Sequence, residues 1–104
     1  MTESPTESPG PTQNESAFEY DYIKSASNKQ KHGIDFEEAQ VLWKDTNRTK
    51  TPSEFIGESR IMTTAKYHEK LYTAIYTERN GAIRIISVRR ARSNEVRLYE
   101  HKDN

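Results

Sequence analysis

The pair Asn80-Gly81 lies between two runs of β-forming residues and restricts the fold of this chain more than any other sequence feature. Asparagine and glycine tolerate the positive φ angles of a two-residue type I′ turn, so the pair predicts an antiparallel hairpin. A two-residue turn also fixes the register of the hairpin. Residue 79 is expected to face 82, 76 to face 85, 74 to face 87 and 72 to face 89.

Side chains alternate between the two faces of a strand, so this register predicts what each face of the hairpin carries. We expect the more aliphatic face to be covered by helices and the tyrosine-bearing face to be open for base stacking and phosphate contacts. The covered face would hold Leu71, Ile75, Ile86 and Val88, with Thr77 and Arg84 near the turn. The open face would hold Tyr72, Ala74, Tyr76, Ile85, Ser87 and Arg89.

Two short helices are predicted before the hairpin. Asp21 suits the N-cap of the first, which runs to His32 and ends at Gly33, a residue that adopts the left-handed conformation easily. Asp35 and Glu38 form a capping-box pattern that begins the second helix. Its packing face would consist of Phe36, Ala39, Leu42 and Trp43.

The predicted fold class is α+β, with two N-terminal helices packed on a small antiparallel sheet of about four strands and a C-terminal helix. Ser93 is the expected N-cap of that last helix, in which Val96 and Tyr99 lie one turn apart. Besides the second strand of the hairpin, β-rich segments lie near Arg48–Thr51, where Pro52 indicates an edge, at Arg60–Ala65 and at Leu71–Glu78, with a turn at Lys66–Lys70.

The chain of 104 residues is expected to form one domain over residues 18–104. Residues 1–17 contain the tandem repeat Thr2-Glu3-Ser4-Pro5 and Thr6-Glu7-Ser8-Pro9, and their polar composition predicts a disordered tail. Cysteine is absent, which excludes disulfides and thiol chemistry. No apolar run has the length of a membrane span or a signal-peptide core, so we expect a cytoplasmic protein without a membrane partner.

Charge is unevenly distributed, although the formal net charge is zero. Between Arg79 and Arg97 there are six arginines and one acid, Glu95. Such a block is typical of proteins that bind a polyanion or an acidic partner. A solvated, arginine-rich face with no ligand is the alternative.

Motifs for most kinds of catalysis are missing. The histidines are isolated, no glycine-rich phosphate loop is present, and no serine-nucleophile motif occurs, so no metal or other cofactor is expected. RNA can still be cleaved, because its 2′-hydroxyl is a built-in nucleophile. The protein then needs only to orient it, move protons and stabilise charge on the phosphate, a role that suits arginine.

Three side chains could move protons: His32, Glu78 and Tyr99. Each also has a structural interpretation: His32 as a helix-capping or surface residue, Glu78 as a solvated cross-strand charge and Tyr99 as a half-buried ring. Arginine is unusual inside a strand, so Arg84 and Arg89 either bind phosphate or form ion pairs. Glu37 and Glu38 are the carboxylates we expect for such pairs.

Two ordered blocks of residues resemble the BrnT family of type II toxins over about residues 18–100. The N-terminal block is Tyr20-Asp21, Lys24, Asn28, Lys31-His32-Gly33, Phe36, Glu38-Ala39 and an aromatic residue followed by Asp45. The C-terminal block is Tyr76-Thr77-Glu78-Arg79, Ile83-Arg84-Ile85-Ile86-Ser87, Arg89-Arg90-Ala91, Glu95 and Tyr99. Tyr20, Thr64 and Val88 stand where this family usually has tryptophan, glycine and alanine.

The resemblance implies a RelE-like fold and a ribonuclease that inhibits translation. It also implies a BrnA-type antitoxin, with a ribbon-helix-helix part, that neutralises the toxin and binds operator DNA. The expected catalytic residues are His32, Glu78, Arg79, Arg89 and Tyr99, and the expected RNA-binding residues are Lys31, Tyr72, Tyr76, Arg84, Arg90 and Arg92. The alternative function is a non-catalytic nucleic-acid-binding or autoregulatory module.

Overall fold

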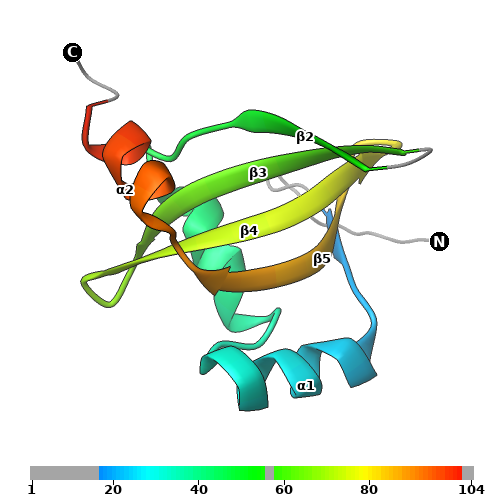
Figure 1. Ribbon diagram of the computed structural model, residues 1–104. Coiled ribbons are helices and arrows are strands. Elements are labelled where there is room, and N and C mark those ends of the chain that lie inside the picture. The colour runs from blue at the N-terminus through cyan, green and yellow to red at the C-terminus, as the bar shows by residue number, and fades with distance from the viewer. Residues whose placement is uncertain (1–16, 56–57, 102–104) are drawn as a thin grey trace, which may run out of the picture.

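A computed structural model describes residues 17–55 and 58–101, which form one curved sheet with helices on both of its faces (Figure 1). The sheet order is β1-β5-β4-β3-β2, with β1 parallel to β5 and the other pairs antiparallel. In chain order the elements are β1 (Ala17–Glu19), α1 (Tyr22–His32), the 3₁₀ helix η3 (Glu38–Lys44), β2 (Thr51–Phe55), β3 (Glu58–Tyr67), β4 (Lys70–Arg79), β5 (Ala82–Arg90) and α2 (Ser93–Glu100). Except for Ala17, the tail predicted at residues 1–17 lies outside the described residues.

The predicted fold class is therefore wrong in two respects. The sheet is mixed and has five strands, because Ala17–Glu19 pairs in parallel with the start of β5. A strand of three residues is too short to show an alternating pattern, which is why the sequence did not reveal it.

The second N-terminal helix is a 3₁₀ helix and not an α-helix. The two bonds of the predicted capping box are present, since Asp35 Oδ1 accepts from the Glu38 N–H at 2.7 Å and Glu38 Oε1 accepts from the Asp35 N–H at 2.9 Å. The helix itself begins at Glu38 with Glu37 as its N-cap, two residues after the predicted cap. Its buried residues Ala39 and Leu42 are three positions apart, which is the period of a 3₁₀ helix, and the buried Phe36 lies three positions before Ala39, ahead of the helix. The spacing that was interpreted as an α-helical face thus fits the tighter helix better.

Helix α1 agrees with its prediction at both ends. Asp21 is its N-cap, with Oδ1 accepting from the N–H groups of Ile23 and Lys24 at 2.8 and 3.1 Å. Gly33 ends the helix at φ 81°, in the left-handed region. Helix α2 begins at Ser93 with Arg92 as its N-cap, so the cap lies one residue before the predicted one.

The hairpin turn is confirmed, with Asn80 at φ 51° and Gly81 at φ 81°. The predicted register holds from Arg79 opposite Ala82 to Tyr76 opposite Ile85. A bulge then adds one residue, Ile86, to β5. Beyond it the predicted pairs are wrong by one position, because 74 lies opposite 88 and 72 opposite 90.

The predicted assignment of the two hairpin faces is also wrong. Tyr72, Ala74, Tyr76 and Ile85, expected on the open face, are buried in the hydrophobic core, which also contains η3 residues such as Leu42. The bulge turns Val88 onto the same face, where it is fully buried. Only the turn-proximal part of the opposite face stays open, because α2 covers the other end of the sheet (Figure 1).

The remaining strands are longer or later than predicted. β2 begins at Thr51 and contains Pro52, which an edge strand tolerates on its unpaired side. β3 and β4 are each ten residues long and join through His68 and Glu69, both with positive φ. Among the described residues, no helix has the length and apolarity needed to cross a bilayer.

Candidate RNA-binding and catalytic site

A basic cavity of about 600 Å³ lies on the open face of the sheet near the Asn80-Gly81 turn. Four of its side chains are cations, and we call Lys24, Arg60, Arg79 and Arg84 the basic face. One carboxylate, Glu78, lines the same cavity. The other lining residues are Ser59, Thr77 and Ile86. An excess of positive charge in a concave surface favours an anionic ligand.

The hairpin register explains why these side chains meet. Arg84 lies directly opposite Thr77, so the two side chains share one face of the sheet. Arg79 lies two residues further along β4 and therefore on that same face. Helix α1 adds Lys24 from its exposed side.

Arg84 is only weakly paired within the chain. Its nearest acidic oxygen is Glu19 Oε1, at 3.9 Å from Nη1, and 41% of the Arg84 side chain is exposed. An exposed ion pair at that distance contributes little free energy, so exchange for a phosphate oxygen costs little. Arg84 is thus well suited to bind an anion.

A smaller cavity of about 280 Å³ continues this surface along α1. Lys31 and His32 line it, together with Ser87 from the bulged part of β5. Lys24 and Ile86 line both cavities, so the two are neighbours. This arrangement brings two predicted residues, Lys31 and His32, next to the basic face.

Asn28 fixes α1 beside β5 at this place. Its side-chain amide donates to the Val88 carbonyl at 2.9 Å and accepts from the Val88 N–H at 3.3 Å, as a neighbouring strand would. The same amide donates to the Ile34 carbonyl at 2.8 Å. Asn28 is buried and its hydrogen bonds hold the helix that carries Lys24, Lys31 and His32.

Glu78 lies at the rim of the basic cavity, near the end of β4. Its Oε2 is 3.3 Å from the ammonium group of Lys50, and both side chains are about half exposed or more. Glu78 faces the core side of the sheet, because it lies opposite Ile83. Glu78 also lines a cavity on the core side, so this residue borders cavities on both faces of the sheet.

Arg89 lies in different surroundings, beneath α2. Its two terminal nitrogens donate to the two oxygens of Glu95 at 2.8 and 2.9 Å, and only 17% of its side chain is exposed. Glu95 also accepts from the Thr73 hydroxyl at 2.9 Å and from the Arg92 N–H at 2.8 Å. The Arg89 guanidinium holds the pKa of Glu95 at about 2, well below its usual range, against the opposing effect of burial.

The Glu95 network extends into the sheet. The Thr73 hydroxyl uses its one hydrogen for Glu95, so the Thr64 hydroxyl must donate to Thr73 at 2.7 Å. All three residues are buried. The ion-pair interpretation of Arg89 is thus the observed one, with Glu95 as the partner and not Glu37 or Glu38.

Tyr99 is also bonded within the fold. Its hydroxyl donates to Asp45 Oδ2 at 2.7 Å, which links α2 to the end of η3. Asp45 further accepts from the N–H groups of Asn47 and Lys66 at 2.8 and 3.0 Å. Burial raises the pKa of Asp45, but these hydrogen bonds outweigh it and lower the pKa overall.

The other predicted RNA-binding residues are dispersed. Tyr72 is buried, its ring 5.8 Å from that of Tyr67 and 5.6 Å from the Arg90 guanidinium. Arg92 is exposed at the start of α2. Tyr76 is buried beside Trp43, and burial, together with the charge of Glu78, raises the pKa of its phenol.

Comparison with known protein families shows which family the chain belongs to. The family described as "ribonuclease toxin, BrnT, of type II toxin-antitoxin system" matches residues 20–95, most of the chain. This chain belongs to the BrnT family. No curated protein sequence matches it.

The family match covers every residue of the basic face, as well as His32, Glu78, Arg89 and Glu95, and ends before Tyr99. A BrnT ribonuclease toxin has RNA as its target and an antitoxin as its partner. A basic cavity in a member of this family is consistent with that target.

Sequence reasoning missed Lys24 and Arg60 as parts of the site. Arg60 precedes Ile61, which pairs with Tyr76 on the core side, so alternation puts Arg60 on the open face. Lys24 has no comparable signal, because only the packing of α1 on β5 brings it there. Within residues 17–55 and 58–101, no three histidine, aspartate or glutamate side chains are close enough to hold a metal ion.

Proposed function

We propose that this chain cleaves RNA on the basic face by attack of the 2′-hydroxyl on the adjacent phosphate, without a metal ion. The observation that carries the proposal is the concentration of Lys24, Arg60, Arg79 and Arg84 around one cavity in a member of a ribonuclease toxin family. Guanidinium groups bind two phosphate oxygens at once and stabilise the extra negative charge of the transition state. Charge stabilisation by arginine gives the reaction what a metal ion would otherwise supply.

Arg84 and Arg79 are proposed to hold the scissile phosphate. Glu78 is proposed as the general base, because it is the carboxylate that lines the same cavity as both arginines. It would take the proton of the 2′-hydroxyl while the 2′-oxygen bonds to phosphorus and the 5′-oxygen leaves. The products are a 2′,3′-cyclic phosphate and, once the leaving oxygen is protonated, a 5′-hydroxyl end.

His32 and Lys31 extend the basic surface from the neighbouring cavity. Histidine is the side chain whose ordinary protonation range lies closest to neutral pH, so His32 is proposed to protonate the leaving oxygen. Lys31 and Lys24 would contact flanking phosphates. Arg89 and Tyr99 support the site through α2 and are not proposed to touch the substrate, since both are hydrogen-bonded within the fold.

In the cell, we propose that cleavage inhibits translation in the cytoplasm and that a BrnA-type ribbon-helix-helix antitoxin neutralises it. Operator DNA would be bound only through that antitoxin. Support for both comes from the type II toxin–antitoxin family to which the chain belongs. Co-expression of the adjacent small reading frame tests the partner, since a neutralising antitoxin restores growth.

The cleavage test uses the full chain purified free of antitoxin and a single-stranded RNA of mixed sequence. Equal cleavage with and without a chelator, cyclic phosphate ends, and complete resistance of a 2′-deoxy strand are expected. Glu78→Gln should slow the reaction by about 100-fold or more, whereas Lys70→Ala, at the far end of β4, should leave it unchanged.

Two results contradict the proposal. Cleavage that requires an added divalent metal, or that yields 3′-hydroxyl ends, excludes 2′-hydroxyl attack on this face. Salt-sensitive RNA binding without cleavage and without growth arrest on induction supports instead a non-catalytic binding module.

A further inference from the structure

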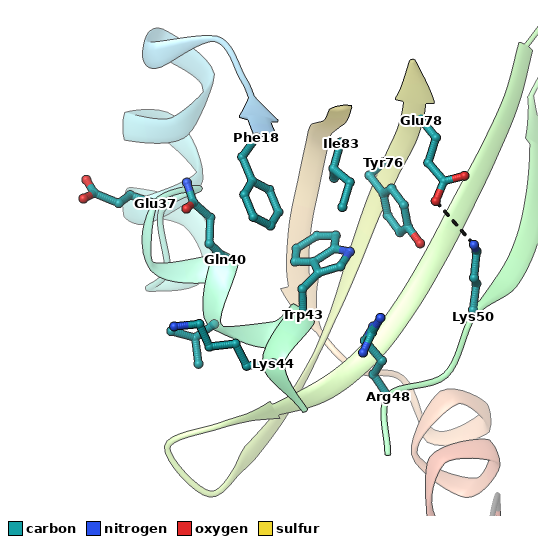
Figure 2. A pocket seen from close by; sticks show the side chains of 11 residues that line it. Phe18, Glu37, Gln40, Trp43, Lys44, Arg48, Lys50, Tyr76, Glu78 and Ile83 are labelled. Carbon is teal, nitrogen blue, oxygen red and sulfur yellow. Dashed lines mark hydrogen bonds and ion pairs between the residues drawn. The ribbon is translucent and has the colours of Figure 1, made fainter. Parts of the chain in front are cut away.

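A third cavity, of about 530 Å³, lies on the other face of the sheet, between η3 and the turn-proximal ends of β4 and β5 (Figure 2). Its volume is within the range of about 300–1,000 Å³ typical of small-molecule sites. We call it the aromatic pocket, after Phe18, Trp43 and Tyr76 on its wall. Glu78 lines both this pocket and the basic cavity, so the two meet at the end of β4.

The three rings form a connected series. The Trp43 ring centre is 5.2 Å from that of Phe18 and 5.1 Å from that of Tyr76, and both pairs are edge-to-face. Trp43 is only half-buried, so part of its indole is available at the pocket surface. These contacts orient the indole and limit the entropy lost when a ligand stacks on it.

Trp43 also has an unsatisfied polar atom. Its indole nitrogen is buried and makes no hydrogen bond of good geometry among the described residues, although it lies close enough to the Tyr76 phenol to oppose the rise of that group's pKa. Buried donors are usually satisfied, so an exception in a cavity wall needs an explanation. The neighbouring Tyr76 hydroxyl is the acceptor within reach, so a base would be held here by the exposed part of the indole ring and not by its nitrogen.

Three cations line the aromatic pocket, Lys44, Arg48 and Lys50, against two carboxylates, Glu37 and Glu78, and Figure 2 shows Arg48 and Lys50 on the side of Tyr76 and Glu78. Arg48 is oriented by a hydrogen bond from its Nη1 to the Asp45 carbonyl at 3.2 Å, and Lys50 is directed toward Glu78 (Figure 2). Aromatic faces combined with cations that follow the backbone are what proteins use to hold single-stranded nucleic acid. An acidic peptide would also meet the cations, but the three aromatic rings on the wall suit a stacked base better.

We infer that the aromatic pocket binds one unpaired base of the RNA substrate, stacked on Trp43, while its phosphate contacts Lys50 and Arg48. The RNA strand would then pass Glu78 and reach Arg79 and Arg84 on the basic face. This inference rests on the proposed ribonuclease function and specifies how the substrate is held. Stacking requires a splayed base, so the pocket selects single-stranded over duplex RNA.

Trp43 is the one tryptophan of the chain, so its fluorescence reports on this pocket alone. The probe is a short single-stranded oligoribonucleotide with 2′-O-methyl groups, which cannot be cleaved by 2′-hydroxyl attack. Saturable quenching is expected, and it should vanish with an oligonucleotide of the same length that carries abasic positions. Added salt should weaken the binding.

Substitution of the exposed or half-exposed cations that line the aromatic pocket tests their phosphate contacts without disturbing the core. Lys50→Ala and Arg48→Ala should each weaken the quenching affinity by about fivefold. Lys70→Ala removes an exposed lysine at the other end of β4 and should change nothing. Trp43→Ala is avoided because it would remove the reporter and a ring that packs against the core.

The outcomes separate this inference from the proposed function. If RNA is cleaved and the 2′-O-methyl oligonucleotide binds without quenching Trp43, the pocket is not a base site and the ribonuclease proposal stands. Quenching by an antitoxin-derived peptide but not by RNA would make the pocket a protein-docking surface and overturn the inference. If RNA is neither bound nor cleaved, both proposals fail.

Discussion

Arg84 and Arg89 come from the same strand, five residues apart, and have opposite surroundings. Arg89 is held by both oxygens of a buried carboxylate, whereas Arg84 is 41% exposed and meets its nearest acid at 3.9 Å. The block of arginines that looked uniform in the sequence thus divides into a structural end under α2 and an open end near the turn. Charge density alone does not distinguish the two, because the difference lies in the acid that each arginine meets.

The structural end of the arginine block, beneath α2, should lose the most stability when Glu95 is substituted. Glu95→Ala should destabilise the fold by about 3–5 kcal/mol, because it leaves the Arg89 charge buried without its partner and removes the acceptor of Thr73. Urea unfolding followed by circular dichroism measures the loss. Glu100→Ala, in the same helix but exposed, is the matched control and should cost less than about 0.5 kcal/mol. A loss below about 1 kcal/mol for Glu95→Ala would mean that α2 is not held by this network.

Low pH should reduce the unfolding free energy of the native chain through the same ion pair. The pKa of Glu95 is lowered to about 2 from a value near 4.5, so its contribution is complete above about pH 4.5. It is lost as the pH falls from there through about 2, and amounts to roughly 2–3 kcal/mol. Unfolding free energies measured from pH 6 down to pH 2 test this. Glu95→Gln should flatten the dependence, and an unchanged slope in that variant would contradict the assignment.

Local chemistry in the sequence predicted local structure well. The Asn80-Gly81 turn, the Asp21 and Gly33 ends of α1 and the capping bonds of Asp35 all depend on neighbours along the chain, and all are present. What failed depends on distant contacts. Which face of the hairpin η3 covers was predicted wrongly, and a single bulged residue, Ile86, shifted the hairpin pairs, so that Val88, buried as expected, shares a face with Ala74 and not with Ile75.

The candidate site shows the same limit. Alternation along β4 and β5 correctly grouped Arg84 with Thr77, because residues near the turn keep the simple register, but it placed the pair on the face expected to be covered and assigned Arg79 to neither face. Lys24 reaches that face only through the packing of α1, and the partner of Arg89 came from α2 instead of from the segment at Glu37 and Glu38. Contacts between elements carry no periodic signal in one sequence.

The open end is tested by Arg84→Ala. Removal of a charge-assisted phosphate contact should lower single-turnover RNA cleavage by about 10- to 100-fold while the unfolding free energy changes by less than about 0.5 kcal/mol. Arg89→Ala is the informative counterpart, because it should lose stability first and activity only as a consequence. Equal losses of stability in the two variants would remove the distinction between the two ends.

Tyr99→Phe tests whether Tyr99 only stabilises the fold or also takes part in catalysis. It has the smallest expected effect of these substitutions. The substitution removes only the hydroxyl that donates to Asp45, which keeps its bonds from the Asn47 and Lys66 N–H groups. We expect a loss of about 1 kcal/mol in unfolding free energy and an upward shift of the Asp45 pKa, since one hydrogen bond that stabilises the carboxylate is gone. The cleavage rate of the folded variant should equal that of the native chain, measured under single-turnover conditions well below its melting temperature. A tenfold slower reaction at unchanged substrate affinity would instead return Tyr99 to the catalytic group and extend the active site beneath α2.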